Sequence, residues 1–210
     1  MAQRYEAVLF DLLTALLDSW TVWNHAAGSE SMGRKWRAEY LKLTYGCGAY
    51  RPYETLVAEA AASVGLDPVH ADKLDAAWDT LVPWPGVTAT LTTLAATHRL
   101  GVVTNCSERL GRQAALKAGA AFDVVITSER AGFYKPDPRP YRMALDALHL
   151  PPERVLFVAG SGFDLFGTSA VGMDAFWHNR VGLEPPPGAP RPLLQSRDIG
   201  DVLSLTAGDR

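Results

Sequence analysis

The chain has 210 residues, of which 48% are hydrophobic and 20% charged, a composition typical of a compact globular protein. That length suits one domain, or one domain with a smaller insertion. The formal net charge is -3 and the basic residues are spread along the chain, which argues against nucleic acid as a partner. Cys47 and Cys106 lie far apart, so we expect neither a disulfide framework nor a zinc site. No signal peptide or membrane-spanning stretch is visible, so we expect a cytoplasmic protein without a membrane partner.

Short apolar runs predict the strands of a parallel sheet. They cover residues 7–10, 100–104, 124–126 and 155–158, and near-continuous β-branched runs suit strands that are buried on both faces. Helix-like spacing of apolar residues falls between them, at 87–96, 110–118 and 141–148. Strands that alternate with helices predict an α/β fold with a doubly wound parallel sheet.

One long segment interrupts this alternation. Residues 19–83 are rich in tryptophan and helix-like, and we interpret them as an α-helical cap domain inserted into a core domain of residues 1–18 and 84–210. Two prolines at 82–86 stiffen the return crossing and suggest a hinge. The proline-rich stretch 184–192 cannot be helical, so we expect a surface loop before a short last element.

Polar residues follow the predicted strands at their carboxyl ends. The first strand ends at Asp11, the second at Thr104-Asn105, and the fourth runs toward Asp164, while Lys135 follows the third. Ligands of open parallel sheets bind beyond the carboxyl ends of the strands. We therefore expect these side chains to form one site.

The order of these motifs resembles that of the haloacid dehalogenase superfamily over nearly the whole chain. Within that superfamily, the sequences at 103–105, 133–141, 157–158 and 177–180 are similar to the branch that hydrolyses L-2-haloacids. The resemblance implies a Rossmann-like core with a helical cap, a small 2-haloalkanoic acid as substrate, no cofactor or metal, and a homodimer. The five histidines also lack metal-ligand spacing.

The resemblance implies catalytic roles for three of these side chains. Asp11 attacks carbon to form an ester, which splits one difficult displacement into two easier steps. Lys135 keeps Asp11 ionised, and Asp164 with Lys135 positions the water that cleaves the ester. The structural alternatives are a turn residue for Asp11 and a surface salt bridge for Lys135.

Further residues are implied to bind the substrate or to support the site. Thr104 and Asn105 bind the substrate carboxylate or the oxygens of the nucleophile, or else satisfy the turn after their strand. Tyr141 orients Lys135, or else is core packing.

In the cap, alignment through Glu39-Tyr40 places Arg34 at the halide-accepting position and Tyr53 at an apolar pocket position. The alternative for Arg34 is a solvated basic face shared with Lys35 and Arg37. Trp20, Trp23 and Trp36 wall the pocket or form the core of the cap.

A magnesium-dependent phosphatase is the first competing interpretation. Phosphatases of the superfamily carry a general acid two residues after the nucleophile, where this chain has Leu13, and a magnesium-binding aspartate where it has Gly160. Both the missing general acid and the missing magnesium ligand therefore argue against phosphoryl transfer.

The chain also departs from the dehalogenase pattern at four positions that we assign to the substrate and water site. Leu13 replaces an aromatic hydroxyl, Ala159 and Ser161 replace a serine and an asparagine, and Phe163 replaces a tryptophan. Two alternatives stay open: opening of an azetidine-2-carboxylate ring by the same attack on carbon, and a scaffold that binds without turnover. The amine released by ring opening would require an acid near Arg34.

Overall fold

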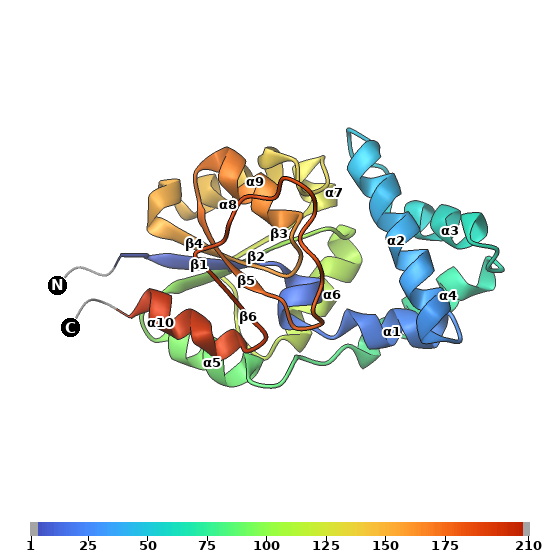
Figure 1. The fold of residues 1–210 in the computed structure, drawn as a ribbon, viewed down its shortest axis with the longest axis horizontal. Coiled ribbons are helices and arrows are strands. Elements are labelled where there is room, and N and C mark those ends of the chain that lie inside the picture. The colour runs from blue at the N-terminus through green and yellow to red at the C-terminus, as the bar shows by residue number, and fades with distance from the viewer. Residues whose placement is uncertain (1–3, 208–210) are drawn as a thin grey trace.

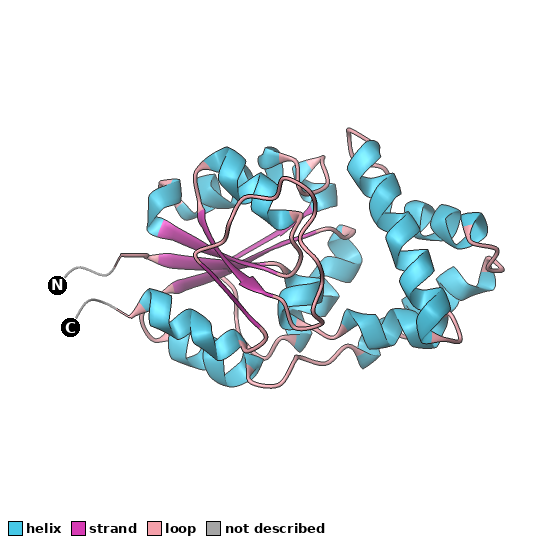
Figure 2. Ribbon diagram, viewed as in Figure 1, coloured by secondary structure: helices cyan, strands magenta, loops and turns pink. Residues whose placement is uncertain are grey.

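The computed structural model describes residues 4–207 and is built on a six-stranded, all-parallel sheet (Figures 1 and 2). The strand order is β3-β2-β1-β4-β5-β6, with bounds β1 (Ala7–Phe10), β2 (Arg99–Thr104), β3 (Val124–Thr127), β4 (Val155–Ala159), β5 (Asp174–His178) and β6 (Leu194–Ser196). The first four match the predicted apolar runs and confirm the α/β class. β5 and β6 were not predicted as strands, and they extend the sheet at its β4 side.

Helices cover both faces of this sheet (Figure 1). On one face lie α7 (Ser128–Ala131), α8 (Pro138–Leu148) and α9 (Asp164–Val171); on the other lie α5 (Val87–Ala95), α6 (Glu108–Lys117), η4 (Ile199–Val202) and α10 (Leu203–Thr206). Each face has its own hydrophobic cluster, centred on α8 for one and on α5 and α6 for the other. A short turn, η3 (Pro152–Arg154), leads into β4. In residues 4–207 no helix has the length and apolarity that crossing a membrane requires.

A second group of helices stands beyond one end of the sheet (Figure 1). It comprises α1 (Ser19–Ala26), α2 (Glu30–Gly46), α3 (Tyr53–Ser63), α4 (Val69–Ala76) and the short η2 (Trp78–Thr80), all within the predicted cap. Trp23 and Trp36 meet edge to face at 4.8 Å, and the Trp36 indole donates to the Val57 carbonyl at 2.8 Å. The core of the cap is thus aromatic, while the division into domains at residues 18/19 and 83/84 stays a prediction.

The two crossings between core and cap run side by side. Leu17 and Pro83 form an antiparallel bridge, the Asp18 N–H donates to the Val82 carbonyl at 2.9 Å, and the Trp84 N–H donates to the Leu16 carbonyl at 2.9 Å. The Trp84 indole also donates to the carbonyl of Thr14 at 3.0 Å. The predicted hinge segment is therefore paired along its length with the chain that leaves the core.

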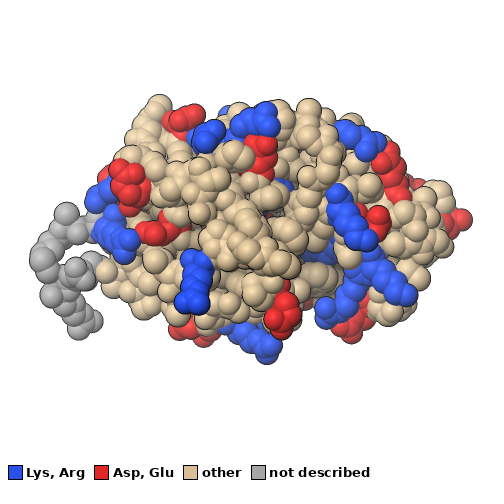
Figure 3. All heavy atoms as spheres, turned by 45° about the horizontal axis from the view of Figure 1, so that its top comes forward, with Lys and Arg blue, Asp and Glu red and all other residues tan. Residues whose placement is uncertain are grey.

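Charged side chains of both signs are mixed over the face of the molecule drawn in Figure 3.

Candidate active site

Asp11 lies directly after β1, at the start of the π-helical turn η1 (Leu12–Leu16). Its Oδ2 accepts three hydrogen bonds, from the Thr14 N–H (2.9 Å), the Thr14 hydroxyl (2.6 Å) and the Ala15 N–H (3.1 Å). Its Oδ1 accepts one, from Lys135 Nζ at 2.8 Å, among the described residues. Because a carboxylate oxygen has two lone pairs, Oδ1 keeps one free for attack while Oδ2 is held in place.

Lys135 joins the two buried carboxylates of the site. Its Nζ lies 2.8 Å from Asp11 Oδ1 and 2.9 Å from Asp164 Oδ1, and its side chain is 4% exposed. Asn105 fixes the backbone of this lysine, because its Oδ1 accepts from the Lys135 N–H at 2.7 Å and its Nδ2 donates to the Lys135 carbonyl at 3.0 Å. Burial lowers the pKa of Lys135, but the two carboxylates outweigh it and raise that pKa above its usual value. The lysine is therefore a permanent cation.

Asp164 begins α9 and accepts four hydrogen bonds. Lys135 and the Tyr141 hydroxyl (2.9 Å) bind its Oδ1, and the N–H groups of Gly160 (3.2 Å) and Ser161 (3.3 Å) bind its Oδ2. Tyr141 thus supports Asp164, whereas the sequence had predicted that it orients the lysine. The Tyr141 ring is fully buried.

The two carboxylates differ in acidity. Burial raises the pKa of Asp11, but the charge of Lys135 and the hydrogen bonds from Lys135 and Thr14 outweigh it and lower that pKa. For Asp164, burial and the negative charge of Asp11 raise the pKa above its usual value, against the opposing pull of Lys135. Asp11 is the better anion of the pair, and Asp164 has the greater affinity for a proton.

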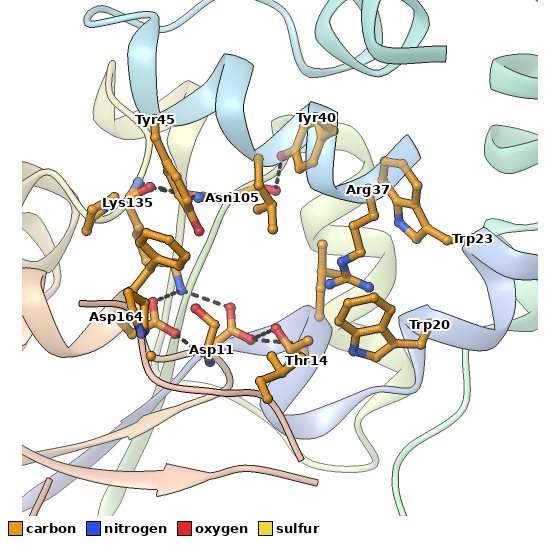
Figure 4. Close-up of a pocket in the computed structure, with 18 of the residues that line it drawn as sticks. Asp11, Thr14, Trp20, Trp23, Arg37, Tyr40, Tyr45, Asn105, Lys135 and Asp164 are labelled. Carbon is orange, nitrogen blue, oxygen red and sulfur yellow. Dashed lines mark hydrogen bonds and ion pairs between the residues drawn. The ribbon is translucent and has the colours of Figure 1, made fainter. Parts of the chain in front are cut away.

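A cavity of about 240 Å³ opens above these groups, between the core and the cap (Figure 4). The cap lines it mostly with aromatic side chains: Trp20, Trp23, Tyr40, Tyr45 and Tyr53. Five predicted substrate-site residues also line it: Leu13, Tyr53, Asn105, Ser161 and Phe163. Thr104 is buried at the end of β2 and Tyr141 lies behind Asp164, so neither hydroxyl contributes to the lining.

Arg37, and not the predicted Arg34, supplies the cap cation of the cavity (Figure 4). Arg37 is 7% exposed, stacks 4.1 Å from the centre of the Trp20 ring, and donates to the Ser19 hydroxyl at 2.9 Å. Arg34 lies one turn earlier on α2, outside the cavity, and pairs with Glu30 at 2.8 Å with half of its side chain exposed. The two arginines are three residues apart on the same stripe of α2, so the sequence pattern alone does not separate them.

The residues do not fit a magnesium ion. Mg²⁺ requires about six oxygen ligands in octahedral geometry, but here the carboxylate oxygens of Asp11 and Asp164 face an ammonium group and N–H donors. Gly160 adds no ligand, and a Cβ at that position would lie 2.4 Å from Asp11 Oδ2. Over residues 4–207 there is no group of three or more His, Cys, Asp or Glu side chains placed to hold a metal.

Sequence reasoning missed several residues of the site. The residues of α2 that line the cavity follow helical i, i+3, i+4, i+8 spacing, so periodicity could have indicated this face: Arg37, Tyr40, Leu41 and Tyr45. Trp20 and Trp23 line the cavity, whereas Trp36 is confined to the core of the cap. Thr14, whose N–H and hydroxyl bind Asp11 Oδ2, was not predicted, because no sequence signal indicates a π-helical turn.

Comparisons with known proteins identify the family of this chain. The family model of haloacid dehalogenase-like hydrolases matches residues 8–178. The chain is 29% identical to (S)-2-haloacid dehalogenase H-109 of Pseudomonas putida, over 95% of this chain and 97% of that enzyme, and 31% identical to (S)-2-haloacid dehalogenase 1 of Pseudomonas sp. strain CBS-3, over 83% and 85%. A crystal structure of a dehalogenase with an intermediate complex superposes with a TM-score of 0.85 at 26% identity, over the full length of both chains. The chain therefore belongs to the haloacid dehalogenase-like hydrolase family, as its ordered strand-end motifs predicted.

Proposed function

We propose that this chain is a metal-independent hydrolase of carbon–halogen bonds, which converts small 2-haloalkanoic acids into 2-hydroxy acids through an ester on Asp11. The named activity of its dehalogenase relatives supports this function. The observation that carries it is the asymmetry of Asp11, whose Oδ2 is held by three donors while Oδ1 accepts one and borders the cavity. Such a carboxylate is positioned for in-line attack.

In the first step, Asp11 Oδ1 forms a bond to C2 of the substrate as the bond from C2 to the halogen breaks. The halide leaves with the bonding electron pair, and C2 inverts. Lys135 assists by keeping Asp11 ionised at the pH of the reaction. No proton donor is required, because chloride or bromide is stable as an anion.

Arg37 receives the halide in this proposal. Within the described part of the chain it forms no ion pair with a carboxylate, so its buried charge is available to an anion. The Trp20 indole N–H and the Tyr53 hydroxyl also line the cavity and are buried without a hydrogen-bond partner in residues 4–207. An unmet buried donor costs about 1–3 kcal/mol, a cost that an anionic substrate or leaving group relieves.

In the second step, water attacks Cγ of the Asp11 ester and Asp164 takes a proton from it. The ester carbonyl is then Oδ2, which already accepts the N–H groups of Thr14 and Ala15 and the Thr14 hydroxyl. These donors stabilise the oxyanion that forms on Oδ2. The bond from Cγ to the substrate oxygen breaks, the 2-hydroxy acid leaves with the proton, and Asp11 ionises again.

Two alternatives are less well supported by the site. For a magnesium-dependent phosphatase, this chain lacks the metal-binding aspartate, because Gly160 stands at that position, and the general acid, because Leu13 stands there. Opening of an azetidine ring needs an acid for the amine beside the cap arginine, but Arg37 makes its hydrogen-bond and ring contacts with Ser19, Trp20 and Trp23. Glu184 also lines the cavity, but among the described residues no ion pair joins it to Arg37. A homodimer stays a prediction from the family resemblance, and a cytoplasmic location stays a prediction from the sequence.

The test is halide release from L-2-chloropropionate and L-2-bromopropionate in the presence of EDTA. We expect release by the wild type and none by Asp11→Asn, whose amide cannot act as the nucleophile. Hydrolysis of para-nitrophenyl phosphate with magnesium is the counter-assay. Phosphate release without halide release would refute the proposal.

The two cap arginines provide a matched pair for the leaving-group site. Arg37→Met removes a charged donor, and a hydrogen bond to a charged group contributes about 1.5–3 kcal/mol, so halide release should slow about 10- to 150-fold. Arg34→Met should stay within about twofold of the wild type, because it loses only an exposed pair. Equal losses in the two variants, measured by stopped-flow halide detection, would reject the assignment to Arg37.

A further inference from the structure

The water of the second step needs more than Asp164 to fix its position. All four lone pairs of that carboxylate already accept a donor, two of them at 2.9 Å and two at 3.2 and 3.3 Å. Only the longer, weaker pair on Oδ2 can be exchanged for a water. Ala159, which ends the neighbouring strand β4, offers no polar side chain.

Tyr45 is a cap residue whose hydroxyl lies on the side of the cavity where Asp164 is located. It lies in the last turn of α2, lines the cavity, and packs its ring on Phe163 with centroids 4.5 Å apart. Figure 4 shows the ring descending from α2, with its hydroxyl end directed toward the Lys135–Asp164 pair. Ser161 lines the same cavity and acts to lower the pKa of that hydroxyl, and the Ser161 N–H binds Asp164 Oδ2.

The hydroxyl of Tyr45 stays protonated throughout the neutral range. Burial, and then the negative charges of Asp164 and Asp11, raise the pKa of Tyr45 well above its ordinary value. Tyr45 is therefore not a base for the water. It is a fixed hydrogen-bond donor and acceptor beside one.

We propose that Tyr45 is a catalytic residue of ester hydrolysis, whose hydroxyl, together with that of Ser161, holds the attacking water between Asp164 Oδ2 and Cγ of the Asp11 ester. The inference rests on the proposed dehalogenase function and assigns a cap residue to its second step. In that step the water oxygen bonds to Cγ, one water proton moves to Asp164, and the Tyr45 hydroxyl keeps its own proton. The cap thereby contributes to both half-reactions, with Arg37 in the first and Tyr45 in the second.

The test is a rapid-quench comparison of Tyr45→Phe with the wild type, using L-2-chloropropionate. The variant keeps the ring that packs on Phe163, so the pocket wall is retained. We expect a burst of about one equivalent of chloride at the wild-type rate, followed by turnover at least about 10-fold slower. Intact-protein mass spectrometry should show the Asp11 ester accumulating in the variant.

Tyr50→Phe is the control for loss of a cap tyrosine hydroxyl, because Tyr50 lies outside the cavity, stacks on Tyr134 and, within residues 4–207, accepts only a backbone hydrogen bond, from the Tyr53 N–H at 3.1 Å. It should behave as the wild type in both phases. Wild-type ester hydrolysis in Tyr45→Phe, or equal slowing of burst and turnover, would overturn the role of Tyr45. Absence of chloride release from the wild type itself would instead overturn the dehalogenase function, so the two failures are distinguishable.

Discussion

Replacing Lys135 by methionine tests the electrostatics of the site most directly. Methionine has a similar length but no charge, so two buried carboxylates lose the cation that lies 2.8 and 2.9 Å from them. Removing one partner of a buried ion pair costs about 3–5 kcal/mol. For a chain of this size each kcal/mol lowers Tm by about 2–4 °C, so we expect Tm to fall by about 6 to 20 °C at pH 8.

The loss in the free energy of unfolding caused by Lys135→Met should be larger at high pH than at low pH. Without Lys135, burial and mutual repulsion raise the pKa of both Asp11 and Asp164 above the unfolded value of about 3.9. A carboxyl whose folded pKa is raised destabilises the fold when it is ionised, and protonation relieves that cost as the pH falls. In the wild type, the lowered pKa of Asp11 stabilises the fold, and this contribution is fully present above the unfolded value of about 3.9 and is lost only below it, outside the window from pH 8 to pH 5. The difference in the free energy of unfolding between Lys135→Met and the wild type should therefore become smaller from pH 8 to pH 5, as the carboxyls of the variant become protonated.

Urea unfolding at both pH values measures this gap. Lys117→Met is the control, because Lys117 pairs at 3.3 Å with Asp79, whose side chain is 71% exposed, and exposed pairs contribute about 0–1 kcal/mol. A Lys135→Met variant that loses less than about 1 kcal/mol at pH 8, or whose deficit is the same at pH 5, would refute the reasoning.

Two further predictions concern the groups around the carboxylates. Gly160→Ala places a Cβ 2.4 Å from Asp11 Oδ2; we expect a loss of about 1–3 kcal/mol in stability and at least about 10-fold slower halide release. Gly46→Ala, which meets open space at the end of α2, should be neutral in the same urea and halide assays. Tyr141→Phe removes a hydrogen bond that lowers the pKa of Asp164, so the acidic limb of the pH profile of turnover should move to higher pH. A limb that stays in place or moves to lower pH would show that Asp164 does not act as the base of the slow step.

The core side of the fold follows from the sequence because its signals are strong. The apolar runs that form β1 to β4 are continuous and largely buried. Such continuous runs are typical of strands in a sheet that is covered on both faces. β5 begins with Asp174 and β6 is a three-residue edge strand behind a proline-rich loop, so neither presents a long apolar run. β5 pairs with β4, and the edge strand β6 pairs with β5, so both depend on a neighbouring strand rather than on a strong pattern of their own.

The site divides in the same way. The sequence alone predicted that three core residues lie together, because parallel topology places the carboxyl ends of the strands at one edge of the sheet: Asp11, Lys135 and Asp164. The cap side could not, because Arg34 and Arg37 share one stripe of α2 and only tertiary packing decides which of them reaches the cavity. Both arginines lie over the Trp20 ring, Arg37 at 4.1 Å and inside the cavity, Arg34 at 5.6 Å, one turn earlier on the helix and half exposed.

The paired crossings between core and cap have a mechanical consequence. Trp84, on the returning crossing, holds the carbonyl of Thr14, and the N–H and hydroxyl of that same threonine hold Asp11 Oδ2. Any movement of the cap relative to the core would therefore act on the turn that holds the nucleophile, since the two crossings are hydrogen-bonded to each other. Access to the cavity and the reactivity of Asp11 are thus coupled through Trp84 and Thr14. An insertion in the returning crossing would therefore slow the attack by Asp11 as well as the entry and release of ligands.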